Sequence, residues 1–311
     1  MMTIYDKLRR RPMAFRSLTG LRVDEFDALA NELVDKIASY DESRLNHRDR
    51  ERRIGAGGQY QHDACNRLLM AMIWLRIYPT YEVLGFVFDL HKSNIGRNLE
   101  VVLAVLREGL GDEIQWPDKT QRQRKMDDFM RDFPEVVAIV DATEQPIQRP
   151  QDDETQKKHY SGKKRRHTLK TQVVVAPDGE LMHVSPTVPG AQHDKKLYDE
   201  SGVGEYLDED EAMMGDSGFQ GIQHQHPAIL PHKKPKGGEL TDDQKKYNRR
   251  VSRVRVVVEN TIAQIKTFRV MAEIYRHDRE GYHDRFQIVA VLVNRRIRRR
   301  PLRHVSPNIT A

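Results

Sequence analysis

Cysteine is almost absent from the sequence, since Cys65 is the only one in 311 residues. A disulfide framework within the chain and a zinc site built from several cysteines are therefore excluded. Hydrophobic runs are also short: residues 101–106 and 288–293 are typical, far below the length of a membrane span. The first residues lack the apolar core of a secretory signal. We expect a soluble protein of a reducing compartment, without a membrane partner.

Aromatic residues make up only 7% of the chain, and no aromatic-rich platform for stacking the bases of single-stranded RNA is present. Charged residues are plentiful instead: Lys and Arg number 52 and Asp and Glu 46, which gives a net charge of +6. This small excess suits a partner made of phosphates but does not prove one, because the location of the charge matters more than its sum.

The spacing of apolar residues changes along the chain. Helical spacing dominates residues 1–118 and returns at 241–269 and 282–298. Between these parts, short apolar runs bounded by turn residues predict strands at residues 136–140, 172–175, 181–184 and 212–214. Helices, then strands, then helices indicate an α domain followed by an α/β domain.

We therefore expect a helical region at residues 1–118, a linker at 119–133 and an α/β domain at 134–311. Pro177-Asp178-Gly179-Glu180, between two of the predicted strands, is typical of a hairpin turn.

Two helices around residue 91 have the spacing of a helix-turn-helix, at about residues 65–107, with Ser93 capping the second helix. The outward face of that second helix would present five polar residues to a major groove: Lys92, Ser93, Asn94, Arg97 and Asn98. Asn94 and Arg97 can read base edges, whereas Lys92 suits a phosphate. A plain antiparallel helical pair has the same spacing and stays an alternative.

Three carboxylates stand in positions where ligands bind. Asp141 ends the apolar run 136–140, Asp216 follows the run 212–214, and Glu259 lies inside a long helix. Each alone is explained as a turn residue, a cap or half of a surface ion pair. Together they describe a site for a hard cation such as Mg²⁺, which prefers oxygen ligands.

The helix that carries Glu259 places further polar residues on the same face. At about 100° per residue, Ser252, Arg255 and Lys266 fall beside Glu259. Arg255 can pair with Glu259 or hold a phosphate, and Lys266 continues the stripe.

Five short motifs occur in an order that resembles the DDE-superfamily transposases, in their bacterial insertion-sequence and PIF/Harbinger-like branch. They are Val140-Asp141-Ala142-Thr143-Glu144, Tyr160-Ser161-Gly162-Lys163-Lys164, Pro189-Gly190-Ala191-Gln192-His193-Asp194, Gly215-Asp216-Ser217-Gly218-Phe219 and Arg255-Val256-Val257-Val258-Glu259-Asn260. The resemblance covers roughly residues 60–300, and its N-terminal part resembles the family's helix-turn-helix.

The resemblance implies an RNase H-like catalytic domain, in which helices flank a mixed central sheet. Asp141, Asp216 and Glu259 take the places of the D-D-E triad, which holds two Mg²⁺ ions, with Mn²⁺ as a substitute. The stretches between them are 74 and 42 residues long. Ser252 stands where related enzymes carry a tyrosine. Asp194 is a rival for the second aspartate, and His193 and Asp194 are otherwise expected to be accessory.

A dense basic segment follows the first aspartate. Residues 157–170 hold seven Lys and Arg and no acid, including Lys163, Lys164, Arg165 and Arg166. Like charges packed this closely repel one another unless an anion lies between them, so we expect DNA phosphates here; a solvated loop is the alternative. For the C-terminal arginine run at residues 295–300, we favour a solvated helix end over a phosphate contact.

These features predict a DNA transposase that binds terminal inverted repeats, hydrolyses phosphodiesters and transfers strands to target DNA. The family implies a homodimer or a larger assembly on double-stranded DNA, and a cytoplasmic, nucleoid-associated location if the source is bacterial. Two alternatives stay open: a domesticated descendant kept as a DNA-binding or regulatory protein, and an endonuclease without strand transfer.

Overall fold

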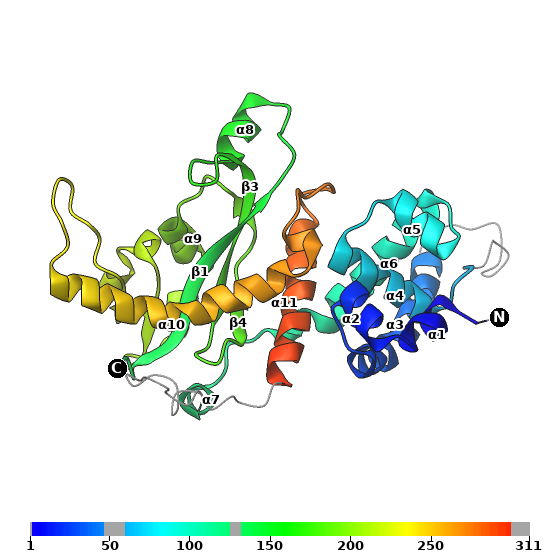
Figure 1. Cartoon of the computed structure of the whole chain (residues 1–311), viewed down its shortest axis with the longest axis horizontal. Helices are drawn as coiled ribbons and strands as arrows, with labels where there is room; N and C mark the ends of the chain where they lie inside the picture. Colours follow the sequence, from blue (N-terminus) through cyan, green and yellow to red (C-terminus); the bar gives the residue numbers. More distant parts are fainter. Residues whose placement is uncertain (1, 47–59, 125–131, 300–311) are drawn as a thin grey trace. The chain divides into compact units, whose positions relative to one another are not determined.

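The computed structural model describes residues 2–46, 60–124 and 132–299 (Figure 1). The chain forms two compact units. The first combines Met1–Asp112 with Lys266–Glu273 and Asp284–Val289, and the second holds the remaining segments, Glu113–Ile265, Ile274–His283 and Ala290–Ala311. Residues 125–131 of the expected linker lie outside the described residues, as does Arg300 of the C-terminal arginine run.

The first unit is helical, as its hydrophobic spacing predicts. Its N-terminal part contains α1 (Ile4–Arg9), α2 (Pro12–Thr19), α3 (Val23–Asn46), α4 (Ala64–Ile77), α5 (Tyr81–Phe88) and α6 (Lys92–Leu110). Helix α4 is buried on all sides from Asn66 to Leu75 and packs against α2, α3 and α6. A helix that is apolar all round can only be stable inside such a bundle.

A segment from the C-terminal part of the chain completes the first unit. Phe268 is buried beside Gly20, the C-cap of α2, and the guanidinium of Arg76 lies 5.4 Å from its ring centroid. The same guanidinium donates to the carbonyl oxygen of Thr267 at 2.5 Å. The 3₁₀ helix that follows, Arg269–Met271, packs against α4.

The second unit is built on a mixed sheet, with strands β1 (Val136–Pro146), β2 (Tyr160–Ser161), β3 (Arg166–Val175), β4 (Leu181–Val184), β5 (Val188–Pro189), β6 (Ala212–Met214) and β7 (Ala228–Ile229). The central order is β2-β3-β1-β6-β7, and β4 and β5 also pair with β3. β1 and β3 are antiparallel, whereas β1, β6 and β7 run parallel to one another. The predicted hairpin turn joins β3 to β4, with Gly179 at a φ of 89°.

The predicted strands are confirmed, but β1 does not stop at Asp141. It continues through five more residues to Pro146, which pairs with Thr168 of β3. The prediction of a strand end at Asp141 was wrong because the apolar run ends there while the backbone pairing with β3 goes on. Asp141 instead lies where the pairing of β1 with β6 has stopped, since the last such pair is Ile139 with Met214.

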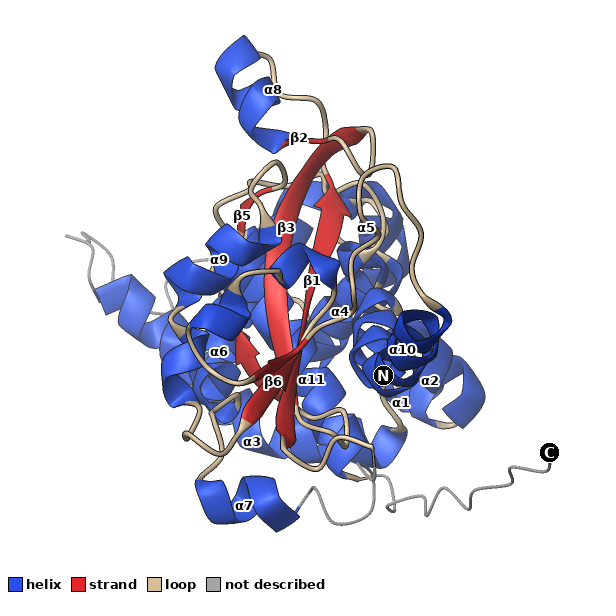
Figure 2. Ribbon diagram, turned by 90° about the vertical axis from the view of Figure 1, so that its left-hand side faces the viewer, coloured by secondary structure: helices blue, strands red, loops and turns tan. Residues whose placement is uncertain are grey.

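Helices flank this sheet: α7 (Lys119–Arg124), α8 (Asp153–His159), α9 (Asp194–Ser201), α10 (Asp242–Lys266) and α11 (Tyr282–Arg298) (Figure 2). A mixed sheet between helices is compatible with an RNase H-like domain. None of the described helices is long and apolar enough to cross a membrane.

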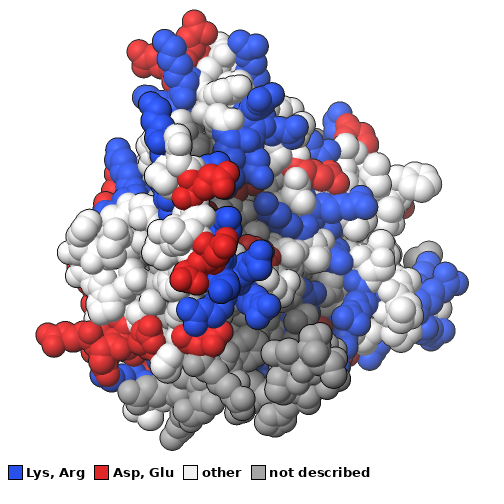
Figure 3. All heavy atoms as spheres, turned by 60° about the vertical axis from the view of Figure 1, so that its left-hand side comes forward, with Lys and Arg blue, Asp and Glu red and all other residues white. Residues whose placement is uncertain are grey.

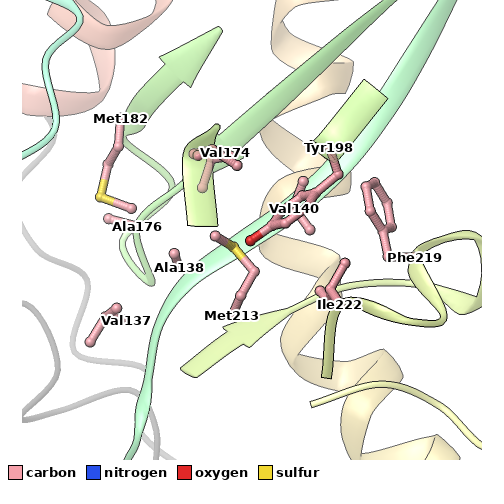
Figure 4. Close-up of a cluster of buried hydrophobic side chains, with 11 residues drawn as sticks. Val137, Ala138, Val140, Val174, Ala176, Met182, Tyr198, Met213, Phe219 and Ile222 are labelled. Carbon is pink, nitrogen blue, oxygen red and sulfur yellow. The ribbon is translucent and has the colours of Figure 1, made fainter. Parts of the chain in front are cut away.

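One face of the sheet is an apolar core. Val140 of β1, Val174 of β3 and Met213 of β6 meet Tyr198 of α9 and Phe219, which follows β6 (Figure 4). Because successive side chains of a strand point to opposite faces, this packing fixes which residues of β1 and β6 face the other way.

Candidate active site and nucleic-acid surfaces

Asp141 of β1 and Asp216, which follows β6, stand at matching positions along two neighbouring parallel strands. Ile139 of β1 pairs with Met214 of β6, and each aspartate stands two residues beyond its member of that pair. Neighbouring strands lie about 4.8 Å apart. The backbone therefore brings the two aspartates side by side, although 74 residues separate them in the sequence.

Both carboxylates point away from the apolar core. Val140 lies in that core, and a Cβ on Gly215 would stand 3.2 Å from atoms of Val140 and of Phe219. Alternation along each strand then puts Asp141 and Asp216 on the opposite face. Asp216 is partly buried and accepts a hydrogen bond from the backbone N–H of Gly218 at 2.7 Å, which caps a short 3₁₀ helix.

Helix α10 brings Arg255 and Glu259 to this face. One guanidinium nitrogen of Arg255 is 3.5 Å from a carboxylate oxygen of Asp141, and the other is 3.9 Å from Glu259. The Arg255 side chain is only 14% exposed, whereas that of Glu259 is 56% exposed. Arg255 thus bridges an aspartate of the sheet and the glutamate of the helix, and Glu259 lies on the solvent side.

The surroundings of Asp141 disfavour the ionised form of its carboxyl group. Burial raises the pKa of its carboxyl to about 6, the nearby Arg255 and the Ala142 N–H lower it, and the carboxylate of Asp216 raises it further. The positive charge of Lys163 also lowers it. A buried carboxylate beside a second one, with partial compensation from one guanidinium, is an environment in which an added cation is stabilising.

The carboxylate oxygens of Asp141, Asp216 and Glu259 suit a hard divalent ion, but the three side chains are not arranged around a common point. Among residues 2–46, 60–124 and 132–299, no group of three His, Cys, Asp or Glu side chains is arranged to hold a metal. Asp141 and Asp216 offer oxygens from adjacent strands, while Arg255 stands between Asp141 and Glu259. The residue types therefore fit Mg²⁺.

Asp194 stands on the other side of the sheet, where it is paired with a lysine. Lys170 of β3 is buried, and its ammonium group donates to Asp194 at 2.7 Å and to the carbonyl oxygen of Gln192 at 2.5 Å. Lys170 shares a sheet face with Glu144, its cross-strand partner, and not with Asp141. Asp194 opens α9 as expected, with His193 as its N-cap.

Asp194 also touches the Asp216 turn. A Cβ on Gly218 would lie 2.7 Å from an Asp194 oxygen and 2.9 Å from an Asp216 oxygen, so both carboxylates line the same glycine. The contact with Lys170 was not foreseen, because the lysine was counted with the basic segment. Residues 168–175 of β3 are all buried, so alternation along the strand gave no signal that Lys170 lies inside.

The rest of the basic segment is exposed: Lys157 and Lys158 lie on α8, Lys163, Lys164 and Arg165 lie in the turn between β2 and β3, and Arg166 begins β3. Arg165 adopts the left-handed conformation, with a φ of 52°. In Figure 3 the projection at the top, which is α8 in Figures 1 and 2, carries Lys and Arg together with a few acidic side chains. The positive charge of Lys163 is among the influences that lower the pKa of the Asp141 carboxyl.

In the first unit, α5 and α6 meet at a tight turn. Asp89 is left-handed, with a φ of 52°, and the N–H of Leu90 donates to the carbonyl of Gly85 at 2.9 Å. The expectation that Ser93 caps α6 was wrong: His91 is the N-cap, and its imidazole accepts from the N–H of Ser93 at 3.3 Å.

The N-terminal end of α6 presents Lys92, Ser93, Asn94 and Arg97 to solvent. Lys92 pairs with Glu82 of α5 at 2.9 Å, and Arg97 donates to Asn94 at 3.0 Å. Asn98, expected on the same outward face, is buried, and its amide donates to the Asn94 carbonyl. Four of the five predicted residues therefore share an exposed surface.

The remaining predicted contacts lie elsewhere. Lys266 is the last residue of α10 and is assigned to the first unit. Arg295 pairs with Glu113, and Arg298 pairs with Glu180 at 2.7 Å. These pairings agree with a structural role for the C-terminal arginines.

Residues 140–294 match a family model described as DDE superfamily endonuclease. The chain is also 31% identical over 230 residues to the probable transposase for insertion sequence element IS702 of Microchaete diplosiphon, an alignment that covers 74% of this chain and 79% of that protein. The chain belongs to the DDE-superfamily transposases. The family match begins one residue before Asp141 and includes Asp216 and Glu259. No solved structure matches the chain.

Proposed function

We propose that this DDE-superfamily chain is an active DNA transposase. It would bind the terminal inverted repeats of its element, hydrolyse phosphodiesters at the ends and join the freed 3′-hydroxyls to target DNA. The observation that carries the proposal is the placement of Asp141 and Asp216 on one sheet face, with Arg255 of α10 beside Asp141 and Glu259 next to Arg255.

Asp141, Asp216 and Glu259 would hold two Mg²⁺ ions, with Mn²⁺ as a substitute. Divalent ions in such a site lower the pKa of an attacking hydroxyl and neutralise the charge on a leaving oxygen. The protein's own part would be to fix Asp141 on β1 and Asp216 in the turn after β6, and to keep Arg255 beside Asp141. Arg255 neutralises Asp141 before DNA arrives and is placed to contact the scissile phosphate afterwards.

Asp194 would act as a positioning residue and not as the second catalytic aspartate. Its carboxylate is already engaged by the buried Lys170, and it lies against Gly218 in the turn that follows Asp216. His193, as the N-cap of α9, would help to hold Asp194 at this place.

DNA recognition would be divided between the parts of the chain. The helical residues 1–118 would read the repeats through a helix-turn-helix formed by α5 and α6, with Lys92, Ser93, Asn94 and Arg97 at the groove. Within the catalytic residues 134–311, the β2–β3 turn, Arg255 and Lys266 would contact phosphates. Synapsis of two ends calls for a homodimer or larger assembly on DNA, and a bacterial host would hold the protein at its nucleoid.

The test is cleavage of duplex DNA that carries the inverted repeats, with Mg²⁺ and with Mn²⁺. Asp216→Asn should abolish cleavage, while Asp194→Asn should retain it at a reduced level, because Lys170 keeps its bond to Gln192. Circular dichroism of both variants checks that they fold. Loss of cleavage in a folded Asp194→Asn protein, together with an active Asp216→Asn protein, would overturn the assignment of the triad.

The reaction products separate the alternatives. Joined products identify a transposase, and cut ends without joining identify an endonuclease. A wild-type protein that binds the repeats but never cuts them would point to a recruited DNA-binding protein.

A further inference from the structure

The side of α10 that precedes Glu259 carries positive charge that the site described above does not use. Residues 244–253 contain five Lys and Arg and no acid. Lys245, Lys246, Arg249 and Arg253 are exposed, and we name these four the α10 basic face. Positive side chains packed this densely repel one another unless an anion binds over them.

Helix geometry makes the α10 basic face continuous with the active site. At about 100° and 1.5 Å per residue, Arg253 lies about 9 Å before Glu259 along the axis, and Arg249 about 15 Å before it. Both are turned by roughly 80° to 120° from Glu259 toward solvent. The opposite side of the helix is buried at Val251 and Val258.

Protein carboxylates neutralise this face only weakly. Lys245 lies 3.3 Å from Asp242 and Lys246 lies 3.5 Å from Asp243, and these aspartate side chains are 87% and 94% exposed. Exposed pairs of this kind contribute little and exchange readily for another anion. Within the described parts of the chain, Arg249 and Arg253 form no ion pair.

A basic loop is tied to the same stretch of α10. His232 and Asn248 exchange two hydrogen bonds, at 2.8 and 3.0 Å, which hold the start of the loop against the helix. The loop then displays Lys233, Lys234 and Lys236, all exposed. Figure 3 brings this end of α10 forward and shows Lys and Arg side chains gathered on the face in view, with acidic ones among them.

We infer that the α10 basic face binds the phosphates of the DNA duplex that continues from the scissile phosphodiester. The inference rests on the proposed function. Cations spread over about two helical turns match an extended polyanion better than a single phosphate group. Val256 is the one large apolar side chain that α10 exposes among the described residues, so neither base stacking nor membrane insertion is supported.

The experiment measures the affinity of the full chain for duplex DNA carrying the inverted repeat, by fluorescence anisotropy over a series of NaCl concentrations. The slope of log Kd against log salt reports the number of phosphates neutralised. The double variant Arg249→Gln/Arg253→Gln should lower this slope by about 2 and weaken binding roughly tenfold or more near 0.15 M salt. A duplex cut back to the scissile phosphate on one side should show no difference between variant and wild type.

The matched control is Lys119→Gln/Lys196→Gln, which removes two positive charges from α7 and α9. Its slope should stay at the wild-type value. An unchanged slope in the Arg249/Arg253 variant, or an equal fall in the control, would overturn the inference while leaving the proposed function intact if the wild type still cuts the repeats. A wild type that binds no DNA would overturn both.

Discussion

At the residue scale, the candidate site contains a carboxyl group whose ionised form is unfavourable. Asp141 is buried beside Asp216, and its pKa is raised from 3.8 to about 6. The folded protein therefore binds a proton at Asp141 more tightly than the unfolded chain does. The contribution of Asp141 to the free energy of unfolding should therefore fall as pH rises from about 4 through 6, because ionisation of Asp141 then costs more in the folded state. Buried, neighbouring carboxylates of a cation site lower the free energy of unfolding when no cation is bound.

Asp141→Asn should stabilise the metal-free protein. In EDTA at pH 8 we expect a free energy of unfolding higher by on the order of 1–3 kcal/mol, since a shift of about two pKa units corresponds to that size. At pH 4 the gain should nearly vanish, because the wild-type carboxyl is then protonated. Thermal unfolding at both pH values measures the effect.

Asp199→Asn on α9 is the control for that measurement, because it removes a carboxylate that is paired with Lys195. It should not stabilise the protein at pH 8. Added Mg²⁺ should raise the melting temperature of the wild type but not that of Asp141→Asn. A lower melting temperature for Asp141→Asn in EDTA at pH 8 would contradict the account given for Asp141.

At the element scale, two short turns position what the strands and helices present. The turn after β6 holds the Asp216 carboxylate, and Gly218 is the residue that leaves room for it. The turn between α5 and α6 sets the direction of α6, and a Cβ at Gly85 would overlap the carbonyl oxygen of Leu90. Gly218 is surrounded by the movable ends of side chains, whereas Gly85 lies against backbone. We therefore expect substitutions of the two glycines to have different effects.

Gly218→Ala should impair cleavage more than stability. Its methyl group would displace the carboxylate ends of Asp194 and Asp216, which can move at small cost in folding. We expect a loss of cleavage rate of tenfold or more, because small misplacements at a reacting centre are expensive, with a melting temperature close to that of the wild type. Ser217→Ala, one position away, should change neither quantity, and an equally active Gly218→Ala enzyme would contradict the role of this turn.

Gly85→Ala should instead destabilise the first unit by about 1–3 kcal/mol, since the backbone of Leu90 cannot give way without opening the turn. Binding to repeat DNA should weaken along with the melting temperature. Gly111→Ala is the control, because a Cβ there meets nothing within 4 Å. Normal stability of Gly85→Ala would show that the turn is not as tight as described.

Local patterns account for most elements and fail where the partner is distant. The strands at residues 136–140 and 212–214 could be predicted because every residue of these short apolar runs is buried. The continuation of β1 through polar residues to Pro146 could not be predicted in this way, because it depends on pairing with β3. Lys170 was misread for the same reason, since its partner Asp194 lies 24 residues away. His91 replaced Ser93 as a cap because the turn at Asp89 sets where α6 begins.

At the scale of the whole molecule, neither unit is a continuous stretch of chain. The first unit buries Phe268, Val270 and Met271, which lie more than 150 residues beyond its N-terminal part. Hydrophobic periodicity is a local signal and carries no information about this arrangement. A domain boundary placed at one point in the sequence therefore describes only part of each unit.

Phe268→Ala should loosen helices that are remote in sequence. Removing a fully buried phenylalanine costs about 3–5 kcal/mol, and we expect faster amide hydrogen exchange in α2 and α4 of the first unit. Ile274→Ala, which shortens a half-exposed side chain, should leave exchange in these helices unchanged. Acceleration confined to the end of α10 would show that Phe268 does not support the first unit.

Because the first unit includes the segments Lys266–Glu273 and Asp284–Val289, it can be completed only late in the synthesis of the chain. N-terminal domains ordinarily fold while the ribosome is still adding residues. Here the six N-terminal helices must wait until residue 289 has left the ribosome before all their packing partners exist. A chain terminated early, even one long enough to contain Asp141, Asp216 and Glu259, would carry an incomplete first unit. If that unit reads the element's ends, truncated products would compete poorly with the full-length protein for the same DNA.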